Sequence, residues 1–266
     1  MTTPIALAIA GSDSGGGAGI QADLKTFAAL GVFGASVVTA LTAQNTHGVT
    51  AIHDVPHAFV TAQLDAVFAD LKVNAVKVGM LSQSTIIEAV AEGLARHGAT
   101  NLVVDPVMIA TSGDRLLAAD AIDVLRRVLI PRALIITPNL PEAAVLLDTS
   151  IAESETDMRD QAERLLKFGA RAVLIKGGHG AGPESIDIFL DGTAELRLPA
   201  PRIATRHTHG TGCTLSSAIA AGLAKGLPLA DAVVEAKAYV TLAIAAASRL
   251  EVGTGRGPVH HFHAWW

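Results

Sequence analysis

The chain has 266 residues, of which 50% are hydrophobic, and its formal net charge is −5. This apolar content is enough for a large core and excludes a disordered chain. The acidic balance and the absence of lysine or arginine runs give no general attraction for nucleic acid or anionic membranes, so we expect a small-molecule partner, no nucleic acid and no membrane.

The sequence also indicates a compartment. The single cysteine, Cys213, cannot form a disulfide within the chain, and no basic segment precedes the first apolar run at 5–10, as one would in a secretory signal. The apolar runs are much shorter than the roughly 20 residues that span a bilayer. We therefore expect a cytoplasmic protein without a transmembrane segment.

Short aliphatic runs alternate with longer segments of helical period along most of the chain. The aliphatic runs predict strands over 5–10, 35–41, 75–80, 101–106, 133–138 and 172–177. The helical periods predict helices over 20–30, 57–71, 84–97, 119–128 and 156–168. Strands that are apolar without alternation are typical of a parallel sheet with helices on both faces. The pattern therefore predicts a doubly wound α/β sandwich.

The last third of the chain departs from this alternation. Residues 185–190 and 194–198 predict a hairpin, because an Asp-Gly pair between them supplies the positive φ angles of a tight turn. After Gly210, two alanine-rich helical stretches are divided near 226–228. No linker or repeat marks a second unit, so we expect residues 1–266 to form a single domain.

Candidate functional positions follow the ends of the predicted strands. In an open parallel sheet, ligands bind beyond the carboxyl ends of the strands, where loops lead into helices. In strand order these positions are the loop 12–19, Gln44, Met80, Asp105, Asn139 and Lys176. Their common placement predicts one ligand site at this edge of the sheet.

The segment 11–26, GSDSGGGAGIQADLKT, connects the first strand to the first helix. Its glycines allow close backbone approach to a ligand, and free N–H groups at the helix start favour an anion or a polar ring substituent. Ile20 interrupts the spacing of a dinucleotide fingerprint, and the chain lacks the Gly-Lys pair of a Walker A loop. The alternative is a connection whose glycines serve only the turn.

The segment 207–213, HTHGTGC, makes a more specific prediction. Gly210 and Gly212 leave backbone N–H groups unobstructed, and the following helix directs its positive end at the turn, which favours an oxyanion. The same field predicts a lowered pKa for Cys213, which then accepts a proton from a substrate hydroxyl. In the alternative, Cys213 is a small buried apolar residue. His207 and His209 lack zinc-site spacing, and we expect a structural or ring-stacking role for them.

A set of motifs resembles one kinase family. GTGC before a small-residue helix resembles the anion-hole signature of ribokinase-like kinases, in which an aspartate normally replaces Cys213, and Asn139-Leu-Pro-Glu142 resembles their phosphate element. With GSDSGGGAGIQADLKT, TAQNTHGV, VVDPVM, LIKGGH and GPVHHFHAWW, the chain is similar over nearly its whole length to the hydroxymethylpyrimidine and phosphomethylpyrimidine kinases of thiamine biosynthesis. Cysteine at this position is usual in that branch.

The resemblance implies a ribokinase-like three-layer α/β/α sandwich with a mostly parallel central sheet. It also implies ATP and Mg²⁺ as cofactors and a homodimer. Two phosphorylations are expected, first of 4-amino-5-hydroxymethyl-2-methylpyrimidine and then of its monophosphate to the diphosphate. The expected partners are therefore this pyrimidine, its phosphate and ATP.

Phosphoryl transfer needs neutralised phosphate charge and an aligned acceptor oxygen. On the resemblance, Cys213 deprotonates or orients the hydroxymethyl group. The developing charge is held by backbone N–H groups of the turn, which comprises Gly210, Thr211 and Gly212. Lys176 offers a cation to the nucleotide phosphates, or else is a surface charge at a strand end.

The nucleotide and its metal ion are assigned on the same basis. Asn139, Lys176 and Thr211 are expected to contact ATP. Asp105 and Glu142 are expected to bind Mg²⁺, directly or through water, since this ion prefers carboxylates, phosphates and retained waters. Taken singly, Asp105 is equally a strand terminator, and Glu142 equally a charge in the first turn of a helix.

The acceptor ring needs complementary donor and acceptor groups, which a glutamine amide supplies. We predict that Gln44 binds the aminopyrimidine and that Asp23 binds its polar edge or hydroxyl, although Asp23 is equally a solvated helix charge. The positions predicted to surround the ring are Gly11, Ala18, Met80 and Val107, of which the last two are equally core residues.

Two other functions stay open from the sequence. A pyridoxine or pyridoxal kinase acts on a ring that also carries a hydroxymethyl group beside polar substituents. A non-catalytic vitamin or nucleotide binder would use the same loops without needing Cys213. Asn139, Glu142, Lys176 and the anion turn together favour a kinase over such a binder.

Overall fold

The computed structural model describes residues 2–108, 120–180 and 182–266. In these parts of the chain, the strands are β1 (Ile5–Asp13), β2 (Phe33–Asn45), β3 (Gly48–Asp54), β4 (Ala75–Val78), β5 (Leu102–Val104), β6 (Ile135–Ile136), β7 (Val173–Ile175), β8 (Glu184–Leu190) and β9 (Glu195–Pro201). The main helices are α1 (Gly19–Ala29), α2 (His57–Asp70), α3 (Ser84–Arg96), α4 (Ala121–Val124), α5 (Leu140–Leu147), α6 (Glu155–Leu166), α7 (Thr211–Ala224) and α8 (Leu229–Ala245).

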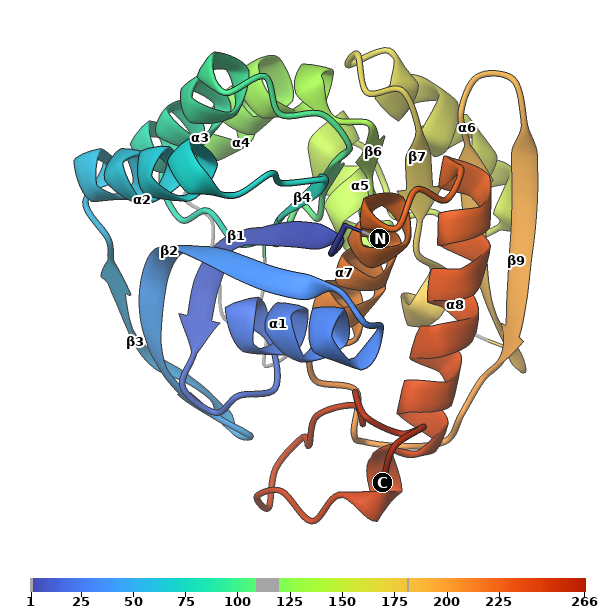
Figure 1. Ribbon diagram of the computed structural model, residues 1–266. Coiled ribbons are helices and arrows are strands. Elements are labelled where there is room, and N and C mark those ends of the chain that lie inside the picture. Colours follow the sequence, from blue (N-terminus) through green and yellow to red (C-terminus); the bar gives the residue numbers. More distant parts are fainter. Residues whose placement is uncertain (1, 109–119, 181) are drawn as a thin grey trace.

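The nine strands form one sheet with the order β3-β2-β1-β4-β5-β6-β7-β8-β9 (Figure 1). In this order, neighbouring strands from β2 through β7 are parallel to one another. The antiparallel pairs are β2 with β3, β7 with β8, and β8 with β9. The parallel strands therefore end at one common edge. The predicted mostly parallel α/β sheet is confirmed.

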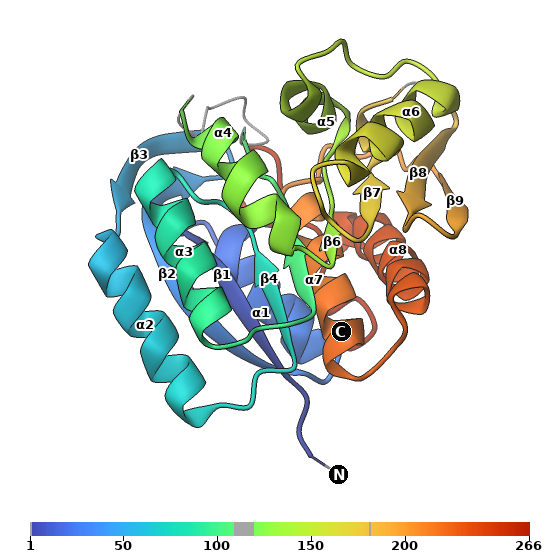
Figure 2. The ribbon, with the colours of Figure 1, turned by 90° about the horizontal axis from the view of Figure 1, so that it is seen from above.

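Helices cover both faces of the sheet, as the strand sequences require. Alternate residues of a strand point to opposite faces, and in β1 Leu7 and Ile9 join the core beneath α2, α3, α5 and α6. Ala6, Ala8 and Ala10 join the opposite core beneath α1, α7 and α8. Figure 2 shows α2 and α3 on the face opposite α1. Small side chains on β1 and α7 let this helix pack close to the strands, which places its N-terminus at the carboxyl edge.

Two elements were absent from the sequence prediction. Most side chains of β3 are exposed or half-buried, so this edge strand has no continuous apolar run to indicate it. The helix α5 begins with a reciprocal capping box in which Asn139 is the N-cap and Glu142 is the third helical residue. Glu142 is thus a first-turn helix residue, the structural alternative that the sequence left open.

The helix predicted over 119–128 is shorter and less regular than expected. Residue 119 lies outside the described residues. From 121 onward α4 is followed by a π turn, η1 (Leu125–Leu129), and by a 3-10 turn, η2 (Ile130–Arg132). Among the helices that the structure describes, none is long and apolar enough to cross a bilayer.

Candidate active site

A cavity of about 610 Å³ lies at the carboxyl edge of the parallel strands. This volume is typical of sites for small molecules and cofactors. Its lining includes every site residue predicted from the sequence except Asp23, namely Gly11, Ala18, Gln44, Met80, Asp105, Val107, Asn139, Glu142, Lys176, Gly210, Thr211, Gly212 and Cys213. The strand ends therefore converge on one site, as the α/β topology predicts.

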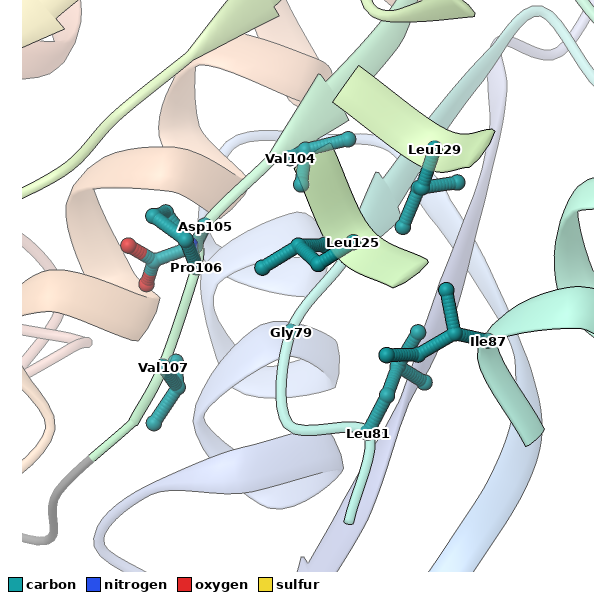
Figure 3. A pocket seen from close by; sticks show the side chains of 9 residues that line it. All are labelled: Gly79, Leu81, Ile87, Val104, Asp105, Pro106, Val107, Leu125 and Leu129. Atoms are coloured by element: carbon teal, nitrogen blue, oxygen red, sulfur yellow. The ribbon is translucent and has the colours of Figure 1, made fainter. Parts of the chain in front are cut away.

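A second cavity of about 10 Å³ lies beside the first (Figure 3). Its wall includes the apolar side chains of Leu81, Ile87, Leu125 and Leu129, and the carboxylate of Asp105 points away from them (Figure 3). A cavity needs about 10–15 Å³ to hold even one water. This void is a feature of core packing, and Asp105 belongs to the larger site.

The anion turn needs glycine at position 210. Gly210 is the N-cap of α7 and has a φ of 80°, in the left-handed region. A Cβ atom there would also lie 1.9 Å from the carbonyl oxygen of Gly17, because the turn packs directly on the glycine-rich loop. The first residues of α7 therefore reach the cavity. The N–H of Thr211 donates to the carbonyl oxygen of Thr208 at 3.3 Å, and the first helical bond follows from Thr214 to Gly210 at 2.9 Å, so the N–H groups of the two residues between them precede the helical ladder.

Cys213 is half-buried in the first turn of α7, and the backbone N–H of Gly19 bonds to its sulfur. The predicted lowering of its pKa is wrong. Burial raises the pKa of the Cys213 thiol to about 11, although the nearby Lys77 ammonium acts in the opposite direction. Asp23 and Asp105 add to the rise. Without ligand, Cys213 is therefore a neutral thiol at neutral pH.

Lys176 joins the two predicted metal-binding carboxylates. Its Nζ lies 2.7 Å from Asp105 Oδ1 and 3.8 Å from Glu142 Oε2, and all three groups are largely buried. Burial raises the pKa of Glu142 to about 7; the Lys176 ammonium opposes this shift, and the Asp105 carboxylate adds to it. Two carboxylates thus share one ammonium, which leaves this wall of the cavity short of positive charge.

The donor set fits Mg²⁺ of the kind that carries nucleotide phosphates. Such ions are usually held by one or two carboxylates together with phosphates and waters. Asp105 and Glu142 supply the carboxylates, and the raised pKa of Glu142 shows that this wall favours uptake of positive charge. In the described parts of the chain no group of three acidic, histidine or cysteine residues could hold a metal.

Asn139 is partly occupied by its helix cap. Its Oδ1 accepts a hydrogen bond from the Glu142 backbone N–H at 2.8 Å, and its own N–H donates to Glu142 Oε2 at 2.8 Å. Because Oδ1 is engaged in this cap, contact with a nucleotide would use the side-chain N–H₂ group.

The glycine-rich loop does not present its N–H groups to a ligand anion, which corrects the sequence prediction. The carboxylate of Asp13 accepts hydrogen bonds from the backbone N–H groups of Gly15 at 2.8 Å, Gly17 at 3.0 Å and Ala18 at 2.8 Å. An internal carboxylate therefore fills the anion-binding curve of this loop. The parts of this segment that line the cavity include Gly11, Ala18 and Gly19.

The residues predicted for the acceptor ring share one part of the wall. Thr42 Oγ1 lies 2.9 Å from Gln44 Oε1 and also 2.9 Å from the carbonyl oxygen of Ser12, and its single proton can go to either acceptor. A Cβ atom at Gly11 would lie 3.0 Å from the sulfur of Met80, so glycine there gives the sulfur room. Met80 and Val107 line the cavity, and Met80 is 7% exposed.

Asp23 has a different position from the predicted one. It is fully buried, its carboxylate lies 2.8 and 2.9 Å from Lys77 Nζ, and it accepts a hydrogen bond from Ser217 Oγ at 2.7 Å. It does not line the cavity, so we correct its assignment from a substrate ligand to the partner of a buried lysine. The lysine lies on β4, and no sequence spacing indicates that pairing.

Sequence reasoning did not place two parts of the lining in the site. His209 lies 2.8 Å from Asp13, from which it is separated by 196 residues in the sequence. Lys237 on α8 lies 2.8 Å from Asp187 on β8, and both are buried at the cavity wall. The only signal for His209 was its place beside Gly210, and a structural role was assigned to it there.

Comparisons with known proteins agree on one family. Residues 13–260 match the family model described as phosphomethylpyrimidine kinase. A hydroxymethylpyrimidine/phosphomethylpyrimidine kinase of Rhizobium meliloti (strain 1021) is 64% identical over 264 residues, which cover 99% of each chain. The Escherichia coli (strain K12) protein of the same name is 54% identical over 261 residues, or 98% of each chain.

Solved structures give a second comparison. An ADP complex of Bacillus subtilis pyridoxal kinase is similar with a TM-score of 0.92 and 35% identity, covering 99% of both chains. A phosphomethylpyrimidine kinase from Clostridium difficile 630 is similar with a TM-score of 0.80 and 45% identity, covering 90% of this chain and 99% of that one.

Proposed function

The chain belongs to the phosphomethylpyrimidine kinase family, and on this premise we propose that its cavity transfers the terminal phosphoryl group of ATP to hydroxymethylpyrimidine. The enzyme is a kinase of thiamine biosynthesis with the ribokinase-like fold, and it phosphorylates first the alcohol and then the monophosphate. The observation that carries the proposal is one cavity in which the N-terminus of α7 and Cys213 meet the cluster of Lys176, Asp105 and Glu142.

The transfer joins the hydroxymethyl oxygen to the γ-phosphorus and breaks the bond from that phosphorus to the β,γ-bridging oxygen, which leaves as part of ADP. The turn at Gly210, Thr211 and Gly212 directs its N–H groups and the positive end of α7 toward the oxygens of the moving group. These donors stabilise the charge that develops there. No covalent bond to the protein is needed.

Cys213 has a positioning role in the ground state. A neutral thiol is a hydrogen-bond partner for the hydroxyl group but not yet a base. In a loose phosphoryl-transfer transition state the attacking oxygen forms little bond, so its proton can leave late. We therefore propose that the Cys213 thiol holds the hydroxyl in line, and that only its thiolate form, after the thiol has released its own proton to solvent, takes up the hydroxyl proton as transfer proceeds.

Asp105 and Glu142 would hold Mg²⁺ directly or through waters. When bound, this ion neutralises phosphate charge and aligns the nucleotide. Lys176 keeps the two carboxylates in place and adds its own charge beside the phosphates. Asn139 and Thr211 complete the proposed nucleotide contacts from the starts of α5 and α7.

The pyrimidine ring is proposed to lie against Met80 and Val107, with Gly11 and Ala18 leaving space for its substituents. Gln44 pairs with its polar edge. The apolar side chains of Met80 and Val107 then pack on the ring, while the hydroxymethyl group reaches Cys213. The amide is the part of this site that offers directional hydrogen bonds to a flat ring.

A second candidate substrate is pyridoxal, because solved pyridoxal kinases have closely similar chains with TM-scores of 0.92. A competition assay with ATP, Mg²⁺ and equal amounts of hydroxymethylpyrimidine and pyridoxal separates the two functions. The proposed function predicts a higher kcat/KM for the pyrimidine, and a higher value for pyridoxal would reassign the substrate. A non-catalytic vitamin binder is set aside, because the family is one of enzymes.

Two expectations from the sequence carry over as proposals. We propose that the enzyme works as a homodimer, as the resemblance implies. We also propose that it works in the cytoplasm, which agrees with its single cysteine. Sedimentation equilibrium of the purified chain tests the homodimer. A mass of one chain at micromolar concentration would contradict it.

A further inference from the structure

Three distant segments meet at one ring nitrogen of His209. Its Nε2 lies 2.8 Å from Asp13 Oδ2 and 3.4 Å from Gln44 Nε2. Asp13 ends β1, Gln44 lies near the end of β2, and His209 precedes α7. All three residues line the cavity, and both Asp13 and His209 are buried.

Hydrogen-bond accounting fixes the proton on this ring. Burial alone would raise the pKa of Asp13, but its hydrogen bond from His209 and those from Ala18 and Gly15 hold the pKa below its ordinary value. Asp13 is therefore a carboxylate, which only accepts hydrogen bonds. Since His209 Nε2 faces it at 2.8 Å, this nitrogen carries a proton and points it at Asp13.

That proton determines what Gln44 can offer. A protonated Nε2 cannot accept a hydrogen bond from the Gln44 amide, so the 3.4 Å approach positions the amide without consuming its N–H groups. At the other end of the amide, Oε1 lies 2.9 Å from Thr42 Oγ1, whose single proton can go either to this oxygen or to the Ser12 carbonyl oxygen, also at 2.9 Å. The N–H₂ group of Gln44 is thereby kept as a donor for an acceptor atom in the cavity.

The backbone holds His209 in this place from several sides. The backbone N–H of His209 donates to the carbonyl oxygen of Gly257 at 3.1 Å. The carbonyl oxygen of His209 accepts from the N–H of Val259 at 3.3 Å. A Cβ atom at Gly17 would lie 2.4 Å from His209 Cδ2, so the ring packs on a backbone that leaves room for it. The position of the ring is thus set by the glycine-rich loop and by the C-terminal segment.

We infer that the Asp13–His209 pair is a positioning element that orients the Gln44 amide as a hydrogen-bond donor toward an acceptor nitrogen of the substrate ring. The inference rests on the proposed function, in which Gln44 binds that ring. In this inference His209 acts through Gln44, as a positioning residue and not as a catalytic one.

A double-mutant cycle tests the pair with hydroxymethylpyrimidine as the substrate. His209→Leu fills the site without a donor and is expected to raise KM for the pyrimidine about tenfold, the effect of losing one hydrogen bond between the Gln44 amide and the ring. KM for ATP should stay unchanged and kcat should change less than KM. In the Gln44→Ala background the same substitution should add little, because its target is already gone.

Two matched variants give the cycle its controls. His209→Gln places an amide N–H near the position of Nε2 and is expected to recover part of the lost affinity. His207→Leu changes a histidine of the same loop that lies outside the cavity lining, and it should leave KM unchanged. Additive effects of His209→Leu and Gln44→Ala, or an unchanged KM in His209→Leu, would overturn the inference.

The unsubstituted protein supplies a test that does not depend on a variant that folds. Two-bond ¹H–¹⁵N spectra of the histidine rings are expected to show Nε2 of His209 protonated, and an unprotonated Nε2 would overturn the inference. Calorimetric binding of the pyrimidine to each variant separates this question from catalysis. Binding without turnover in the unsubstituted protein would refute the proposed function. The positioning inference would then be decided by the pyrimidine affinities of the variants, which should fall in His209→Leu and stay unchanged in His207→Leu.

Discussion

Lys77 and Asp23 form an ion pair that no solvent reaches, with Nζ 2.8 Å from Oδ1. Ser217 Oγ donates to the same Asp23 oxygen at 2.7 Å. The pair therefore ties β4 and α1 to α7, one turn after Cys213. Its energetic value lies in keeping both charges matched, because an unpaired charge in a dry core is costly.

The first prediction concerns this pair. Lys77→Met leaves the Asp23 carboxylate buried without its cation and is expected to lower the free energy of unfolding by about 3–5 kcal/mol. The double variant Lys77→Met with Asp23→Leu removes both charges and should recover most of that loss. Urea unfolding of the three proteins provides the measurement. A loss below about 1 kcal/mol in the single variant would show that the pair is not structurally important.

Cys213 gives a prediction about reactivity. Because burial raises its pKa to about 11, its alkylation by iodoacetamide should speed up about tenfold for each pH unit between pH 7 and 10. The single cysteine makes the modified residue unambiguous. Mass spectrometry of the alkylated protein over time gives the rate. An alkylation rate that already reaches its plateau below pH 8 would contradict the raised pKa and support the lowered pKa that the sequence predicted.

Glu142 gives a prediction about pH and stability. Its pKa is raised from 4.5 to about 7, so the folded chain binds this proton more tightly than the unfolded chain. The stability that the protonated Glu142 side chain contributes to the folded chain is fully present below about pH 4.5 and is lost as the pH rises through about 7. Glu142→Gln retains a residue type suited to the capping box, and it should raise the free energy of unfolding at pH 8 by about 3 kcal/mol.

The matched experiment for Glu142 is chemical denaturation of both proteins without nucleotide from pH 4 to pH 8. The two curves should meet at low pH and separate as the pH rises. Parallel curves would contradict the raised pKa. Glu142→Gln is also expected to need more Mg²⁺ for half-maximal turnover, since one proposed carboxylate ligand is removed.

Gly210 gives a prediction about backbone geometry. An alanine there would have a φ of 80° and a Cβ atom 1.9 Å from the Gly17 carbonyl oxygen, so Gly210→Ala should displace the anion turn and abolish most turnover. Gly226 is a matched control, because its φ is 89° and a Cβ atom there meets nothing within 4 Å. Gly226→Ala should cost only about 1 kcal/mol of stability and leave turnover intact. Equal effects on turnover would contradict the steric argument.

Local patterns predicted the elements that carry a continuous apolar run, a helical period or a clear turn signal. The run that starts at Ile5 became β1, and the alanine-rich stretches after Gly210 became α7 and α8. The edge strand β3 escaped prediction because its side chains face solvent and carry no apolar run. The convergence of strand ends was predictable because the topology of a parallel sheet fixes it.

Long-range electrostatics were not predictable from spacing. Asp23 was assigned to the substrate because nothing in the sequence reveals Lys77 on a neighbouring strand. The pKa of Cys213 was predicted from the helix end alone, whereas burial outweighs that field in the folded chain. His209 was expected to have a structural or ring-stacking role, and its pairing with Asp13 was not predicted because the two residues are 196 positions apart in the sequence.

The central claim is that phosphoryl transfer to the pyrimidine takes place beside Cys213. The most direct measurement follows ³¹P signals of ATP, Mg²⁺ and hydroxymethylpyrimidine with the unsubstituted protein and with Cys213→Ser. The unsubstituted protein should form the monophosphate and then the diphosphate, with one ADP for each transfer. Cys213→Ser should lower kcat by about a hundredfold or more at an unchanged KM. ADP formed without a phosphorylated pyrimidine, or equal kcat values for the two proteins, would contradict the account.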